Sequence, residues 1–180
     1  MQAAVSNSVF YVVAEGMAAV ILLVMFIQDW RWRGIQWPLF PMLAGLLLVS
    51  HLRNGTLSAV LTGFAINSLL LGLQVLLLGM YVRLRFRASL LLYLGLGDIL
   101  YWLACALYFS PVLFLTYQLV SLLAALGAHL LFSRAYISTA SVRIPLAGFQ
   151  AASLLLVLLL LWSVPAYRQF DDEALLALCW

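Results

Sequence analysis

Two aspartates lie within apolar segments of this chain, and they are its strongest candidates for chemistry. Asp29 ends the first apolar segment, whereas Asp98 lies in the fourth, in the order Gly95, Leu96, Gly97, Asp98. A carboxylate inside the hydrocarbon region costs roughly 2.5 kcal/mol or more, so an intramembrane acid faces the protein interior or a water-filled cavity. Both aspartates are therefore candidate functional residues.

Two carboxylates close together could hydrolyse a peptide bond. In a low-dielectric site, like-charge repulsion and desolvation leave such a pair with a single shared proton near neutral pH. The ionised member can take a proton from water while the protonated member donates to the scissile carbonyl, without metal, cofactor or covalent intermediate. Gly95 and Gly97, which have no side chains, would let a partner helix or an extended substrate approach Asp98 closely.

The composition is that of an integral membrane protein. Of the 180 residues, 67% are hydrophobic and only 8% are charged, and the mean hydropathy is +1.13. A membrane helix needs about 20 apolar residues, so the length allows about five to seven crossings and no separate soluble domain. We predict one all-α domain over residues 1–180, a polytopic bundle of about six helices in the lipid bilayer.

Apolar runs bounded by charges or turn residues mark the expected helices. The six predicted spans cover residues 8–28, 38–52, 58–82, 89–109, 112–133 and 145–164. The first run has no Lys or Arg before it, has a long apolar core and is followed by no polar domain. We therefore expect it to be a retained helix and not a secretory signal.

The basic residues predict the orientation of the bundle. All are arginines, and those that follow the first, third and fifth spans are Arg31, Arg33, Arg83, Arg85, Arg87, Arg134 and Arg143. Only Arg53 and Arg168 fall on the other side. The positive-inside rule places the first group in the cytoplasm and both termini outside. The net charge of +3 then reflects topology, and no nucleic-acid partner is expected.

This topology puts both aspartates in the cytoplasmic half of the membrane, but at different depths. Asp98 would lie about 15 Å beyond Arg87 if the fourth helix began there. A dyad therefore requires Asp29 to lie below the interface or the fourth helix to begin late.

Three places in the chain carry a resemblance to a known family. Asp29 ends a helix and is followed by two arginines, an Ile and Pro38; residues 95–98 form a GxGD motif after a basic loop; and residues 144–148, Ile-Pro-Leu-Ala-Gly, form a proline-containing turn before the last span. In these features the chain resembles the GxGD aspartyl peptidases of the prepilin peptidase type, which include bacterial type IV prepilin peptidases and archaeal preflagellin peptidases.

The resemblance implies an intramembrane aspartic endopeptidase, multi-pass in the inner membrane. Asp29 and Asp98 would be its catalytic dyad, and Gly95 and Gly97 would support the motif. Its partner would be a membrane-anchored pilin-like precursor, whose leader peptide is cut at the cytoplasmic face. No cofactor and no metal are implied.

The chain also departs from the family pattern. Leu100 occupies a position that is often Lys, Gln36 replaces the expected proline, and the turn at 144–148 lacks a second proline and an aromatic residue. Cys105 and Cys179 lack CxxC spacing, so we expect neither a zinc site nor the N-terminal methyltransferase segment of the larger enzymes. The match is to a short form of the family.

Two other functions fit the same residues. A small proton-coupled transporter could use Glu15, Asp98 and Asp29 as a relay, although Glu15 lies about 21 Å from Asp29 along one helix. A catalytically silent relative could serve as a membrane scaffold. His129 is expected to be a packing residue, and Cys105 a small core residue.

Overall fold

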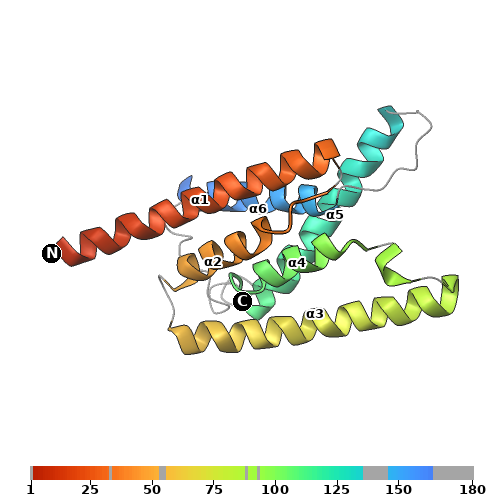
Figure 1. Cartoon of the computed structure of the whole chain (residues 1–180), viewed down its shortest axis with the longest axis horizontal. Coiled ribbons are helices and arrows are strands. Elements are labelled where there is room, and N and C mark those ends of the chain that lie inside the picture. Colours follow the sequence, from red (N-terminus) through yellow and green to blue (C-terminus); the bar gives the residue numbers. More distant parts are fainter. Residues whose placement is uncertain are drawn as a thin grey trace, which may run out of the picture.

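The computed structural model describes residues 2–32, 34–52, 56–87, 89–92, 94–135 and 146–163. Among these residues the structure is all-helical, without a strand (Figure 1). The helices are α1 (Gln2–Trp32), α2 (Leu39–His51), α3 (Leu57–Phe86), the 3₁₀ turn η1 (Leu90–Leu92), α4 (Leu96–Cys105), α5 (Pro111–Ala135) and α6 (Leu146–Ser163). The residues singled out above that lie outside the described part are Arg33, Arg53, Arg143, Ile144, Pro145, Arg168 and Cys179.

Three helices in the described part of the chain are long and apolar enough to cross a membrane. They comprise Phe10–Trp32 of α1, all of α3, and Pro111–Ala128 of α5. α2, α4 and α6 are shorter apolar helices. With a rise of 1.5 Å per residue, α2 is about 20 Å long and α4 about 15 Å, less than the roughly 30 Å of a hydrocarbon core. The all-helical, apolar character predicted from the sequence is confirmed.

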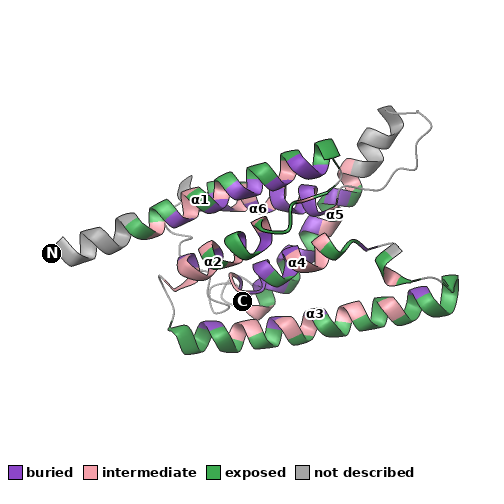
Figure 2. Cartoon of the chain, in the orientation of Figure 1, coloured by how far each residue is buried: buried purple, intermediate pink, exposed green. Residues whose placement is uncertain are grey.

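The helices pack unequally around a core centred on α4 and α6. α1 packs along α6 and α2, α2 also contacts α4, and α5 packs against α6. α3 runs along one side of the bundle and makes few contacts (Figure 1). Most of its surface is exposed or half-buried, including Leu69 and Leu84 (Figure 2). Because these exposed side chains are leucines, this surface is suited to lipid and not to water.

Buried polar groups join helices that are distant in sequence. The hydroxyls of Tyr101 on α4 and Tyr117 on α5 lie 2.7 Å apart, and each lies within 3.0 Å of the carbonyl oxygen of Gln150 on α6. The side chain of Asn67 on α3 donates to the carbonyls of Ala106 and Phe109, at 3.0 and 2.8 Å. The sequence places Asn67 in an apolar span, and its role as a hydrogen-bonding link between helices follows from these contacts.

The fourth span differs from its prediction. The prediction of a continuous helix over 89–109 is wrong, because α4 begins only at Leu96 and ends at Cys105. Arg87 adopts the left-handed conformation, with φ of 50°, and ends α3; the backbone at Gly95 is extended. Glycine is a poor helix former, so the run at 89–109 can break here although residues 90–97 contain no charged or strongly polar side chain.

We expect the substitution Asn67→Leu to lower the free energy of unfolding by about 1–3 kcal/mol, because two buried carbonyls lose their hydrogen-bond donor. Titration of the purified protein with a denaturing detergent measures this change. Thr62→Val on the same helix is the matched control: Thr62 is exposed, and its hydroxyl bonds only to the carbonyl of Ser58. A loss no larger than that of the control would contradict the linking role of Asn67.

Candidate active site

Asp29 lies in the last turn of α1 and is almost completely buried. Its side chain is 8% exposed, and its Oδ2 accepts a hydrogen bond of 2.7 Å from the backbone N–H of Gly148 on α6. The preceding residue, Gln28, accepts the backbone N–H of Gln36 at 3.1 Å and so ties down the chain that leaves the helix. A buried carboxylate needs such donors because an unpaired one would be strongly unfavourable.

Gly148 allows α6 to come this close to Asp29. A Cβ atom at Gly148 would lie 2.9 Å from both Cβ and Oδ2 of Asp29, a separation that real Cβ atoms do not adopt. Next to this contact, the rings of Trp30 and Phe149 meet edge to face with centroids 5.9 Å apart. The close approach of α1 and α6 thus depends on a position without a side chain.

Asp98 lies in the first turn of α4 and caps its own helix. Its Oδ2 accepts the backbone N–H of Gly95 at 3.0 Å, and its N–H donates to the carbonyl of Gly95 at 3.1 Å. A Cβ at Gly95 would lie 3.2 Å from Oδ2 of Asp98, whereas a Cβ at Gly97 would make an ordinary contact of 3.5 Å with Phe40 on α2. Of the two motif glycines, Gly95 is therefore the one that the carboxylate constrains.

The structure brings the two aspartates together. Asp98 interacts electrostatically with Asp29 and with the backbone N–H of Ala147. Consecutive N–H groups of α6, those of Ala147 and Gly148, therefore face the two carboxylates. N–H groups in the first turn of a helix have no partner within the helix and favour anions. The late start of α4 places Asp98 in its first turn, where it interacts with Asp29 in the last turn of α1.

The two carboxylates differ in how far the protein covers them. Asp29 is buried, whereas Asp98 is only half-buried and its neighbours Gly95 and Leu96 are exposed. The exposed surface next to the pair therefore lies on the Asp98 side. Two such carboxyl groups can share one proton. One of them can then donate this proton to a bound group, while an unprotonated oxygen of the other accepts a proton.

The other ionisable candidates lie elsewhere. Glu15 lies on α1 and interacts electrostatically with Tyr108, which follows the far end of α4. His129 belongs to α5, but its side chain lies outside the described residues. Cys105 is fully buried, as expected of a core residue. The sequence analysis assigned Ala147 and Gly148 no role of their own. The signals were their place in the turn at 144–148, which carries part of the family resemblance, and two small residues in succession at the start of the last apolar run.

Comparisons with models of protein families, with curated proteins and with solved structures found no match to this chain.

We expect Gly148→Ala to lower the free energy of unfolding by about 1–3 kcal/mol, because the new methyl group overlaps the side chain of Asp29. Denaturing-detergent titration measures it. Gly72→Ala is the matched control, since nothing lies within 4 Å of a Cβ at Gly72 on α3, and alanine there should stabilise the helix by about 0.5–1 kcal/mol. Equal stability of the two variants would contradict the close contact at Gly148.

Proposed function

We propose that this chain is an intramembrane aspartic endopeptidase with Asp29 and Asp98 as its catalytic dyad. Its substrate would be a membrane-anchored precursor of the type IV prepilin class, cut after its leader peptide at the cytoplasmic face. The observation that carries the proposal is that Asp29, bonded to the first turn of α6, interacts electrostatically with Asp98. The GxGD motif at residues 95–98 supports it from the sequence side.

Intramembrane acids without a task are rare, and this pair has the surroundings that acid–base chemistry needs. The backbone N–H of Gly148 holds the carboxylate of Asp29, and that of Gly95 holds the carboxylate of Asp98. A backbone N–H thus orients Oδ2 of each aspartate. Oδ1 of each aspartate is left for water and substrate. The partly exposed Asp98 side gives the substrate its approach.

Hydrolysis would proceed in two steps through the pair. The ionised carboxylate takes a proton from water as the water oxygen attacks the scissile carbonyl carbon, and the protonated carboxyl donates its proton to the carbonyl oxygen. The tetrahedral intermediate then collapses and the C–N bond breaks. The carboxyl proton taken from water passes to the leaving nitrogen, and a hydroxyl proton of the intermediate returns to the other carboxylate, so the pair again holds one proton. The shared proton belongs to the pair and not to one residue.

The substrate must reach the dyad as an extended chain. In a helix, each scissile carbonyl is engaged in an internal hydrogen bond and is shielded by neighbouring turns. Gly95, next to Asp98, is exposed and has no side chain, so an extended segment can approach the carboxylate there. A leader peptide that leaves the membrane at the cytoplasmic interface has the required conformation.

We further propose that all six helices cross or line the membrane, with the N-terminus outside. The arginines after α1 and α3 then lie in the cytoplasm, on the side of the dyad. α4 is too short to span alone, so in this proposal η1 and the turns on either side of α4 complete the crossing. This topology places the acids where a cytoplasmic leader can reach them.

We expect Asp29→Asn and Asp98→Asn each to reduce processing of a pilin-like precursor from the same genome at least about 100-fold, because either change removes the acid–base pair. Co-expression of precursor and protein, followed by a gel shift at matched membrane levels, measures it. Glu15→Gln is the control and should process like wild type, since Glu15 lies near Tyr108 and away from the dyad.

The other outcomes point to other functions. Cleavage that survives both asparagine variants would exclude the dyad. Loss of a proton-coupled flux in Glu15→Gln as well as in the aspartate variants would favour the transporter. A phenotype that needs the chain but tolerates both asparagine substitutions would favour a scaffold.

We expect the proposed topology to appear in the labelling of single cysteines in a Cys105→Ala, Cys179→Ala background. In right-side-out vesicles, Ser58→Cys at the start of α3 should react with a membrane-impermeant maleimide, whereas Trp37→Cys before α2 should react only after detergent is added. Both positions are exposed. The reverse pattern would place the N-terminus inside, and labelling of both from one side would exclude a crossing by α2.

A further inference from the structure

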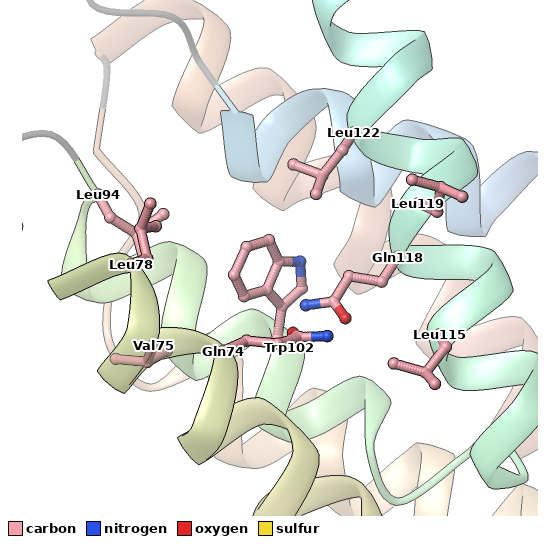
Figure 3. A pocket seen from close by; sticks show the side chains of 9 residues that line it. All are labelled: Gln74, Val75, Leu78, Leu94, Trp102, Leu115, Gln118, Leu119 and Leu122. Carbon is pink, nitrogen blue, oxygen red and sulfur yellow. The ribbon is translucent and has the colours of Figure 1, made fainter. Parts of the chain in front are cut away.

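A cavity of about 280 Å³ lies between α3, α4 and α5, apart from the contact of the aspartates with α6. Most of its wall is leucine and valine, but three polar side chains reach it: Gln74 from α3, Trp102 from α4 and Gln118 from α5. Figure 3 shows the indole nitrogen of Trp102 and the two carboxamides pointing toward the same space. The cavity is thus apolar with a small polar centre.

Two atoms of this polar centre are buried without a hydrogen-bond partner among the residues that the structure describes. They are Nε1 of Trp102, a donor, and the side-chain oxygen Oε1 of Gln118, an acceptor. Both side chains are more than nine-tenths buried, with exposed fractions of 6% for Trp102 and 4% for Gln118. An unpaired buried donor or acceptor costs about 1–3 kcal/mol each. Packing alone gives no reason to keep them here.

The cavity borders the middle of α3, a helix long and apolar enough to cross a membrane. Gln74 is near the middle of the 30 residues of α3, so it lies far from both ends of a membrane-spanning helix. Three leucines of the cavity wall, Leu78, Leu115 and Leu119, are exposed. None of the residues that line the cavity is charged. A ligand would therefore enter from the bilayer and be neutral, because a buried charge without a partner is strongly unfavourable.

We propose that this cavity binds an amide-bearing lipid, a hydrocarbon chain that carries one uncharged secondary amide. The amide carbonyl accepts the N–H of Trp102, and the amide N–H donates to Oε1 of Gln118, so both unpaired atoms gain partners. The leucine wall holds the hydrocarbon next to the amide. The carboxamide of Gln74, which both donates and accepts, completes the polar centre.

The alternatives fit less well. An ordinary acyl chain fills the volume but leaves both polar atoms unpaired. A membrane-spanning peptide helix has no free amides, because each is bonded within the helix. The volume is many times the roughly 30 Å³ share of one water molecule, and it is close to the lower bound of about 300 Å³ for small-molecule sites. This proposal does not depend on peptidase activity.

The test is equilibrium binding of tritiated N-methyldodecanamide to the whole protein in phosphatidylcholine nanodiscs, with empty nanodiscs subtracted. We expect saturable binding at one site per chain. N,N-dimethyldodecanamide, which has no N–H, should compete at least tenfold more weakly. Trp102→Phe and Gln118→Leu should each weaken binding at least tenfold, because each removes one of the two hydrogen bonds.

Two further variants separate binding from folding. Val75→Phe adds volume to the cavity wall and keeps the polar pair, so it should reduce binding while the thermal unfolding midpoint is retained. Trp37→Phe, at an exposed tryptophan before α2, should bind like wild type. No saturable binding, equal competition by the two amides, or wild-type binding by Trp102→Phe and Gln118→Leu together would overturn the proposal. The unpaired atoms would then bind each other or water.

Discussion

The hydrogen bond from the backbone N–H of Gly148 to Asp29 organises the bundle. A buried carboxylate requires a donor, and in this apolar surrounding the donor comes from the backbone of α6 at 2.7 Å. The bond forms only because Gly148 has no side chain to hold the helices apart. It joins the end of α1 to the first turn of α6, and the neighbouring N–H of Ala147 extends the same arrangement to Asp98.

The short helix α4 carries Asp98, the second aspartate of the pair. Polar contacts hold α4 at both ends. At its start Asp98 and Gly95 bond to each other; beyond its end, Asn67 on α3 and His51 on α2 hold the carbonyls of the following turn. Between these ends Tyr101 contacts Tyr117 and Gln150. A helix of ten residues has little stability of its own. These tertiary bonds therefore determine where its side chains lie.

As a result α4 presents different chemistry in successive turns. Asp98 interacts with α1 and α6, whereas Trp102, one turn further on, faces the cavity between α3 and α5. The loose packing of α3 leaves room for this cavity. The carboxylate pair is thus held by tight backbone contacts, and the neutral polar pair of Trp102 and Gln118 lies where the helices separate. Proposed catalysis and proposed lipid binding share one helix but no polar group.

The sequence by itself determined the properties that depend on local composition. The apolar runs predict an all-helical membrane chain, and the rarity of acids within them singles out Asp29 and Asp98. Hydrophobicity could not show that the run at 89–109 breaks before Leu96, because residues 90–97 on both sides of the break contain no charged or strongly polar side chain. Only the tertiary structure brought the two aspartates to one turn of α6, gave Gly148 its role and left Trp102 and Gln118 unpaired. All three features depend on the distances between helices. Long-range packing determines these distances, and the hydrophobic periodicity of the sequence does not encode them.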